Sequence, residues 1–253
     1  MDEPTEHAPP IVELARGDGW IVVAKPPRVV IHRSRHTREE YAALQRTRDL
    51  VGDHVYPVHR LDRPASGCLL FATDRSRTGE LHEALKLGRK TYLAFTRGQF
   101  APEGEVVVET DIVNEGQAKE ARSVVDCLGT GADPRCSLLR VRPETGRHHQ
   151  VRRHVRDLHH PILGDRAHGD HRENKIWRER GLTRLGLHAF KLELELPEGT
   201  LSAVCPLFQD MYEVLSQLPW WARSLDLEPD LGRPFLPWRD QVPPPDLGHG
   251  EDP

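Results

Sequence analysis

Short apolar runs separated by Gly, Pro and Asp turns make up most of the chain, a pattern that predicts many strands and few helices. One such run covers residues 20–24 and is ended by Lys25-Pro26-Pro27. Residues 185–196 alternate apolar and polar positions over a length that suits one long strand. In all, we expect strands at residues 11–14, 20–24, 29–32, 68–72, 89–96, 106–108, 123–125, 137–141 and 185–196.

Three segments place their apolar residues at helical spacing. Ser76 is the expected N-cap of a helix that ends at Leu87, with Gly88 directly after it. We expect the other two helices at residues 149–158 and 207–218. Because strands outnumber helices and do not alternate with them regularly, we expect an α+β fold. Its core would be a mixed, mostly antiparallel sheet flanked by helices.

A single domain is expected to span residues 11–218, because no break in composition divides this stretch. Residues 1–10 are acidic and contain Pro9-Pro10, so we expect a disordered tail. Residues 219–253 are rich in Pro, Trp and acidic side chains. We expect an irregular tail there that docks partly through Trp220, Trp221 and Trp238.

The net charge of −4 conceals an uneven distribution. Residues 140–184 hold 12 Lys and Arg against 6 Asp and Glu, whereas residues 222–253 hold 3 against 7. A local basic face on an acidic protein fits a specific polyanionic partner. A solvated arginine-rich surface is the simpler alternative. Three surface segments are expected: a basic helix or loop at 33–48, an acidic loop or sheet edge at 103–120, and a polar, basic insertion at 171–181.

Sequence and composition also indicate the cellular compartment of the protein. No apolar run approaches the roughly 20 residues that cross a bilayer, and the acidic N-terminus lacks the apolar core of a signal peptide. We therefore expect a cytoplasmic protein with no membrane partner, and a monomer because no extra apolar surface is evident. The four cysteines form no CxxC pair, so we expect reduced thiols rather than a disulfide or zinc framework.

The most distinctive stretch is residues 59–67, in which Asp62 stands between Arg60 and Arg63. Pro64 and Gly67 force a turn before the buried run at 68–72. Asp62 is therefore expected in a loop just before the start of a rigid strand. Nearby positive charge favours the ionised form of Asp62. Arginine also suits contact with phosphate and nucleic acid. A structural ion pair that closes a loop is the alternative interpretation.

Histidines cluster in the second half of the chain and invite a metal-site hypothesis. Their spacing, even together with Asp165, matches no closed zinc set, and we do not expect a metal. The residues concerned are His148, His149, His154, His159, His160, His168 and His171.

Five motifs occur in a specific order: HRLDRPASG at 59–67, KTYLAFTRG at 90–98, PETGRHHQVRRH at 143–154, HPILGDRAHGD at 160–170 and LHAFKLEL at 187–194. Together they resemble the RluA-type pseudouridine synthases, and most closely the tRNA pseudouridine(65) synthase branch of that family. The resemblance covers about residues 11–215. Many relatives carry an N-terminal S4 domain; here the first expected strand begins by Ile11, and we expect no S4 domain.

The resemblance implies an isomerase that converts a uridine of RNA into its C-glycoside without a cofactor or metal. Asp62 would be the catalytic carboxylate, and Arg152 its buried basic partner. Whether Asp62 attacks ribose C1′, attacks the base or removes a ribose proton stays open. Tyr92 would stack on the uracil and serve in proton transfer at C5. Without the motif, Tyr92 is an ordinary strand aromatic.

Substrate contacts are implied for Arg60, Arg147, His149 and Gln150. Arg60 would enter the RNA helix where the target nucleotide leaves it, at a flipping cost of about a few kcal/mol; a surface salt bridge is the alternative for this residue. The expected partner is tRNA, with rRNA or several RNAs as alternatives. From a different class, a non-catalytic RNA-binding or chaperone protein would use the same cleft.

Overall fold

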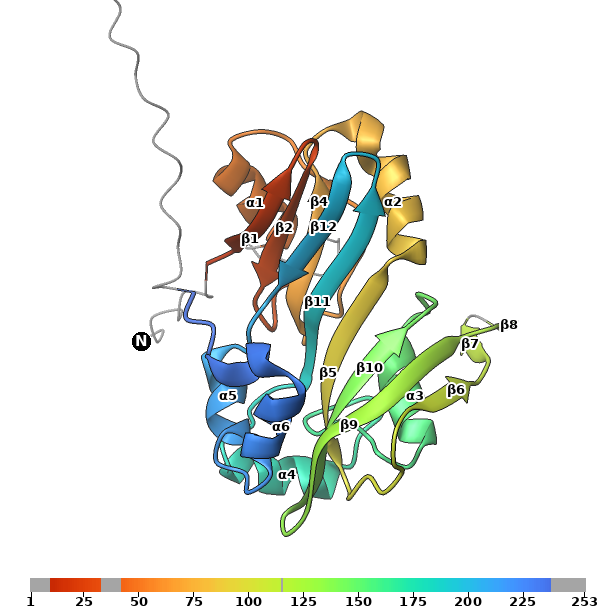
Figure 1. The fold of residues 1–253 in the computed structure, drawn as a ribbon, viewed down its shortest axis with the longest axis vertical. Helices are drawn as coiled ribbons and strands as arrows, with labels where there is room; N and C mark the ends of the chain where they lie inside the picture. Colours follow the sequence, from red (N-terminus) through yellow and green to blue (C-terminus); the bar gives the residue numbers. More distant parts are fainter. Residues whose placement is uncertain (1–9, 33–41, 115, 238–253) are drawn as a thin grey trace, which may run out of the picture.

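The computed structural model describes residues 10–32, 42–114 and 116–237, in which ten strands form one sheet with helices on both faces (Figure 1). A separate two-stranded sheet, β7-β8, lies beside it. In chain order the elements are β1 Val12–Gly17, β2 Trp20–Lys25, α1 Ala43–Val51, β3 Tyr56–Pro57, β4 Ser66–Ala72, η1 Arg75–Arg77, α2 Thr78–Leu87, β5 Arg89–Arg97, β6 Val106–Glu109, β7 Ile112–Asn114, β8 Gln117–Lys119, β9 Arg122–Ala132, β10 Arg135–Pro143, α3 Gln150–Asp157, α4 His171–Glu179, β11 Leu187–Leu196, β12 Gly199–Val204, α5 Gln209–Leu215, α6 Trp221–Leu227 and η2 Pro229–Gly232.

The sheet is mixed and mostly antiparallel, which confirms the predicted α+β class. Its strands run in the order β1-β2-β4-β11-β5-β10-β9-β6, with β12 paired to β11 and β3 paired to β4. Only β4 and β11 are parallel among the strand pairs of the described residues. The edge strand β6 and the β7-β8 hairpin occupy the segment expected to be a peripheral loop or edge.

The junction of β4 and β11 depends on a glycine. Ser66 and Gly67 pair with His188 and Ala189 at this point. Gly67 has a φ of +116°, and a Cβ atom there would overlap the carbonyl oxygen of Ala189. Glycine alone tolerates both conditions. The loop that precedes β4 is thereby brought against the middle of the sheet, where β5 pairs with the other edge of β11.

Both faces of the central strands are covered, which explains their continuous apolar sequences. Every residue of β2 and β4 is buried. On β4, Leu69 and Phe71 belong to the cluster that contains α1, whereas Leu70 belongs to the cluster that contains α2. On β10, Leu139 packs with α3 and Leu138 with the cluster of α4, α5 and α6. In Figure 1, α3 accordingly lies behind β10.

The ends of α2 differ from the prediction. Ser76, the expected cap, lies within the 3-10 turn η1, and Asp74 caps this turn by accepting a 2.8 Å hydrogen bond from Ser76 N. The helix itself begins at Thr78. Gly88 follows the helix but has a φ of −75°, so no left-handed cap requires it. Glycine is favoured there because a Cβ atom would come too close to the backbone carbonyl oxygen of Glu193, besides the side chain of Leu194.

Three further expectations are corrected, and one strand is added. Residues 29–32 form no strand; the carbonyl groups of Val30 and Ile31 instead accept hydrogen bonds from the first turn of α1. Residues 171–181 are not an insertion but contain α4, which Asp170 caps and whose Trp177 is buried. The strand β12 was not predicted. Residues 220–237 are not irregular throughout, because they contain α6 and η2. The predicted docking of this segment through Trp220 and Trp221 is confirmed, since both side chains are buried. Trp238, residues 1–9 and residues 33–41 lie outside the described residues.

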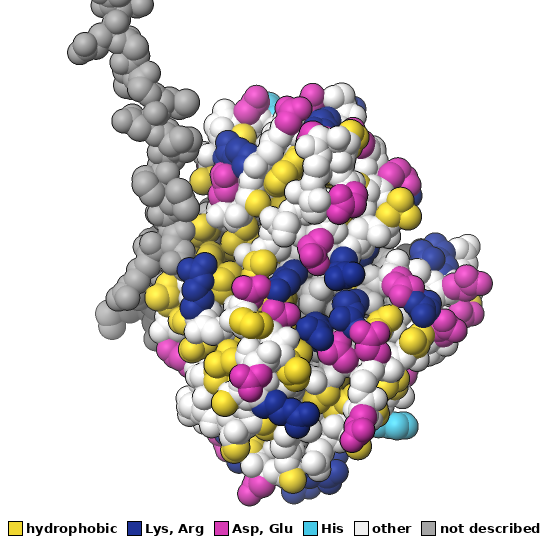
Figure 2. Space-filling view, viewed as in Figure 1, with side chains coloured by type: hydrophobic (Ala, Val, Ile, Leu, Met, Phe, Trp, Pro, Cys, Tyr) yellow, Lys and Arg dark blue, Asp and Glu magenta, His cyan; other side chains and the backbone are white. Residues whose placement is uncertain are grey.

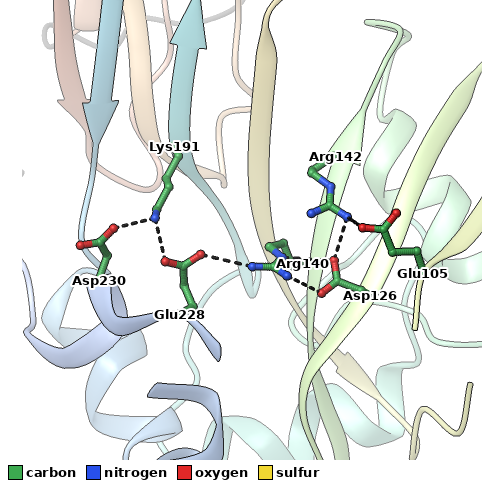
Figure 3. A network of polar contacts seen from close by, with 7 residues as sticks. All are labelled: Glu105, Asp126, Arg140, Arg142, Lys191, Glu228 and Asp230. Carbon is green, nitrogen blue, oxygen red and sulfur yellow. Dashed lines mark hydrogen bonds and ion pairs between the residues drawn. The ribbon is translucent and has the colours of Figure 1, made fainter. Parts of the chain in front are cut away.

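A chain of ion pairs joins this C-terminal segment to the sheet (Figure 3). Lys191 on β11 contacts Glu228 at 2.7 Å and Asp230 at 2.6 Å. Glu228 also contacts Arg140 on β10 at 3.4 Å, and Arg140 pairs with Asp126 on β9 at 2.8 Å. Because the carboxylates of Glu228 and Asp126 are only 9% and 13% exposed, solvent screens these pairs weakly.

The face of the molecule that carries these ion pairs has mixed charge. Figure 2 shows Lys and Arg side chains next to Asp and Glu side chains across its middle. Such a surface does not present one uniform field to a polyanion. Among the described residues, no helix has the length and apolar character needed to cross a membrane.

Candidate active site

The loop that holds Asp62 is fixed on both sides of this residue. Before it, the partly buried His59 accepts a 3.0 Å hydrogen bond at Nε2 from the backbone N–H of Leu70 on β4. Burial lowers the pKa of His59 to about 4, so the ring stays neutral and able to accept. After it, the buried Lys25 donates to the carbonyl of Arg63 at 3.2 Å. Asp62 therefore lies on a loop that is fixed on both sides, just before the start of β4, where the sequence predicted it.

Asp62 is held by an arginine from a distant helix. Arg152 on α3 donates from Nη1 to Oδ2 of Asp62 at 2.9 Å. The guanidinium is 6% exposed and the Asp62 side chain 18% exposed. Arg63, which precedes Pro64 in the loop, donates to the carbonyl of Arg28 at 3.3 Å. The buried basic partner expected for Asp62 is thus in contact with it.

A second carboxylate, Asp165, orients Arg152. It accepts two 2.7 Å hydrogen bonds from Nε and Nη2 of Arg152 and is itself fully buried. Backbone N–H groups of Ala167 and His168 also donate to it. Burial alone would lower the pKa of Arg152, but the contacts with Asp165 and Asp62 raise it. Burial would likewise raise the pKa of Asp165, but Arg152 and the two N–H groups lower it. The arginine and Asp165 therefore stay charged.

Tyr92 is on β5, opposite Ala189 of β11 and Val141 of β10. Burial, followed by the negative charge of Asp62, raises the pKa of its hydroxyl well above the usual value of 10.0. The phenol therefore keeps its proton at neutral pH. A protonated phenol beside a carboxylate gives the site both a proton donor and an acceptor.

All seven residues predicted for the site line one cavity of about 710 Å³. They are Arg60, Asp62, Tyr92, Arg147, His149, Gln150 and Arg152. Further walls come from His59, His82, Lys86, Lys90 and Leu187. Apart from Asp62 and Glu144, the ionisable groups on this wall are cationic, histidine or tyrosine, so the cavity suits an anionic molecule such as a nucleic-acid strand.

Gln150 lies at this wall, yet its amide is bound within the protein. Its Oε1 accepts from Thr145 Oγ1 at 2.7 Å and from Arg147 N at 2.9 Å. Its Nε2 donates to the Arg122 carbonyl and to Ser123 Oγ. With 4% exposure, Gln150 holds the turn at 143–147 against β9 rather than offering a free amide to a substrate. Arg147 and Arg60, by contrast, are exposed at the cavity.

The structure adds two residues to the predicted site. Asp165 was considered only as a possible metal ligand, and His168 only as one member of the histidine cluster. His168 Nε2 lies 3.0 Å from His149 Nδ1, and His149 Nε2 lies 3.7 Å from Asp62 Oδ1. Their only signal in the sequence was membership of the motif at 160–170. The part of the chain that the structure describes contains no group of three or more His, Cys, Asp or Glu placed to hold a metal ion.

A carboxylate, a tyrosine and an arginine thus lie together at one cavity, an arrangement suited to acid–base or nucleophilic chemistry on an anionic substrate such as RNA. The model of the RNA pseudouridylate synthase family matches residues 19–157, more than half of the chain. The chain therefore belongs to the RNA pseudouridylate synthase family and is an isomerase that acts on RNA. Asp62, Tyr92 and Arg152 lie inside the matched range, whereas Asp165 and His168 follow it.

Similar proteins bear the name tRNA pseudouridine synthase C. That of Pasteurella multocida is 39% identical over 240 residues, covering 85% of this chain and 99% of the relative. That of Yersinia pestis is 39% identical over 244 residues, covering 86% and 95%. Among solved structures, human RNA Pseudouridylate Synthase Domain Containing 1 has a TM-score of 0.65 at 23% identity and covers 81% of this chain and 86% of that one. The structural likeness supports the fold.

Proposed function

We propose that the protein converts one uridine of tRNA into pseudouridine, with Asp62 as the catalytic carboxylate. The tRNA substrate is supported by the names of the relatives, which are similar over nearly their whole lengths. Position 65 as the target is supported by the motif resemblance. The observation that carries the catalytic assignment is the 2.9 Å contact between Asp62 and a buried arginine at the wall of the cavity.

In this proposal the isomerisation breaks the bond between N1 and C1′, turns the uracil and forms the bond between C5 and C1′. The C5 proton leaves and N1 gains a proton, so no net atom is exchanged. Asp62 begins the glycosidic step, either as a nucleophile or as a base. Arg152 holds Asp62 in place through its hydrogen bond to Oδ2. Tyr92 stacks against the uracil and its hydroxyl takes part in proton transfer at C5.

Binding of the target nucleotide requires it to leave its RNA helix. Arg60 is exposed at the cavity and is the residue proposed to occupy the vacated position. Arg147 and His149 are proposed to face the phosphate or the wall of the active site. The proposal also takes the enzyme to be a cytoplasmic monomer. Exposed large apolar side chains in the described part are scattered over separate elements, which supports a monomer.

The testing experiment maps pseudouridine in unmodified tRNA and in rRNA fragments after incubation with wild type or Asp62→Asn. We expect one new pseudouridine in tRNA with the wild type, at position 65. With Asp62→Asn we expect the rate to fall by roughly three orders of magnitude or more, because a catalytic group is removed while its shape is kept. Asp53→Asn is the matched control, since the Asp53 side chain is 80% exposed and away from the cavity wall.

Any other outcome would contradict a specific claim of the proposal. Modification of rRNA in place of tRNA would contradict the substrate but keep the chemistry. Full activity of Asp62→Asn would contradict the role of Asp62. Tight tRNA binding by both proteins, with no pseudouridine formed in any RNA, would favour the non-catalytic RNA-binding alternative.

A further inference from the structure

His149 is held in an unusual position between other histidines. It precedes the first residue of α3 and has a φ of +56°, in the left-handed region that non-glycine residues seldom adopt. The ring of His148 stacks on its ring with centroids 3.7 Å apart. Its Nδ1 lies 3.0 Å from Nε2 of His168, and its Nε2 lies 3.7 Å from Oδ1 of Asp62. Each nitrogen of the ring therefore faces a specific group.

The two contacts of His149 favour one tautomer over the other. Between two neutral imidazoles, one nitrogen must donate and the other accept. If His149 donated from Nδ1, its Nε2 lone pair would face the carboxylate of Asp62, which is repulsive. If His168 donates from Nε2, His149 carries its proton on Nε2 and points it at Asp62. The second arrangement is the favourable one, because an N–H beside a carboxylate oxygen is attractive.

The charges around both rings favour the neutral forms that this argument requires. For His149, burial lowers the pKa to about 4; Asp62 opposes this, and Arg152, His148 and His168 add to it. For His168, burial lowers the pKa, Asp165 opposes it, and the charged groups that add to it are Arg152, Arg153 and Arg156 on α3. Both rings are therefore neutral near pH 7.

The same carboxylate positions both groups that face Asp62. Asp165 binds the guanidinium of Arg152 through two hydrogen bonds and accepts the backbone N–H of His168 at 3.0 Å. Arg152 reaches Oδ2 of Asp62, and His149, through His168, faces Oδ1. Arg152 thus hydrogen-bonds one oxygen of Asp62, and the ring of His149 lies 3.7 Å from the other, close enough to interact electrostatically but beyond hydrogen-bond distance.

We propose that His168 is a positioning residue for the isomerisation: it donates from Nε2 to Nδ1 of His149 and so directs the Nε2–H of His149 at Oδ1 of Asp62. The catalytic part of this inference rests on the proposed role of Asp62. A neutral donor at Oδ1 orients the carboxylate without transferring a proton to it. This matters in either mechanism, because Asp62 must begin the glycosidic step as a carboxylate of defined orientation.

The first measurement is nitrogen NMR of the histidine rings in the free protein at pH 7, with the His149 signals assigned by their loss in His149→Gln. We expect His149 to carry its proton on Nε2 in the wild type. In His168→Leu we expect a mixture of tautomers. We also expect a higher pKa for His149, because the hydrogen bond to Nδ1 that opposes protonation is gone. A proton on Nδ1 of His149 in the wild type would overturn the inference. No RNA is needed, so this result is independent of the proposed substrate and activity.

The second measurement is the pH profile of kcat and KM for pseudouridine formation. In His168→Leu we expect kcat to fall about 10-fold, with KM changed less than about twofold and the acid limb moved to higher pH. His168→Gln should recover most of kcat, because its amide places an N–H near the position of Nε2. His54→Leu is the matched control, since His54 is 73% exposed and far from the cavity wall. Wild-type kcat and pH profile in a folded His168→Leu would overturn the inference, as would a failure of His168→Gln to recover when His168→Leu is impaired.

Discussion

At the scale of single residues, Asp165 has more influence on the site than its distance from the substrate suggests. Its two oxygens receive two hydrogen bonds from Arg152 and one each from two backbone N–H groups. A guanidinium with 6% exposure would be costly to bury without such a partner. One side of Arg152 is therefore bound to Asp165, and only Nη1 is directed at Asp62.

This arrangement predicts the effect of Asp165→Asn. The amide cannot balance the buried charge of Arg152, so we expect the free energy of unfolding to fall by about 3–5 kcal/mol. Activity of the remaining folded protein should also fall, because Arg152 loses its orientation. Urea unfolding and pseudouridine assays below the unfolding midpoint measure the two effects. Asp157→Asn, on the same helix as Arg152, is the control; its pair with Arg156 is partly exposed, and we expect a loss of about 1 kcal/mol or less. Equal stability of the two variants would contradict the prediction.

At the scale of elements, the loop of Asp62 depends on how closely β4 approaches β11. The parallel pairing covers Ser66 and Gly67, after which β12 pairs with the rest of β11. No side chain fits at Gly67, because the carbonyl of Ala189 occupies the place of its Cβ. The position of Asp62, five residues earlier, is therefore determined by a backbone contact between two strands.

Gly67→Ala should accordingly lower both the stability and the activity of the protein strongly. The positive φ and the overlap with Ala189 act together, and we expect roughly 3 kcal/mol or more of destabilisation, with loss of activity as β4 moves. Gly79→Ala is the matched control, since a Cβ on this residue of α2 meets nothing within 4 Å. It should be neutral or stabilising by up to about 1 kcal/mol, because alanine favours helix. Thermal and urea unfolding of both variants provide the measurement; a tolerated alanine at position 67 would contradict the structure at this junction.

At the scale of the whole molecule, two neutral histidines, the partly buried His59 and the fully buried His188, link folding to pH. His59 accepts a backbone N–H, as described above. His188 receives the hydroxyl of Ser66 at Nδ1, 2.8 Å away, and lies 2.7 Å from the carbonyl of Cys205 at Nε2. Burial is the largest cause that lowers the pKa of each ring, from 6.5 to about 4. Neither ring takes up a proton in the folded protein until the pH is well below the value at which the unfolded chain does.

The protein should therefore lose stability as the pH falls from about 6.5 to about 4. In this window the unfolded state binds protons at both histidines and the folded state does not, so acid favours unfolding. Each ring lowers the free energy of unfolding by up to about 3 kcal/mol as the pH falls across this window. Urea unfolding at pH 4.5, 5.5, 6.5 and 7.5 (each within about 0.1) measures the slope. The exposed variant His54→Gln should keep the slope and His188→Gln should flatten it; a constant unfolding free energy across the window would contradict the linkage.

The sequence by itself determined those parts that depend on short-range chemistry. Apolar runs between Gly and Pro turns predicted most strands of the sheet, and helical spacing predicted α3 and α5, because these patterns follow from side-chain direction along the backbone. The motifs predicted Asp62, Tyr92 and Arg152, which the structure brings to one cavity. The sequence did not show α4 as a helix, because its buried Trp177 stands among polar residues whose outward direction depends on the rest of the fold.

The tertiary structure alone decided how these residues meet. Asp62 and Arg152 are 90 positions apart, and only the order of strands in the sheet brings their side chains to 2.9 Å. The same holds for Asp165, whose charge is satisfied by Arg152, and for His168, whose direction toward His149 follows from the turn that Asp165 holds. Gln150 shows the opposite case: the sequence predicted it as a substrate contact, but in the structure its amide is bound to β9 and to its own turn. A residue type predicts what a side chain is able to do, whereas burial and hydrogen-bond partners decide which of those capacities remains free for an RNA substrate.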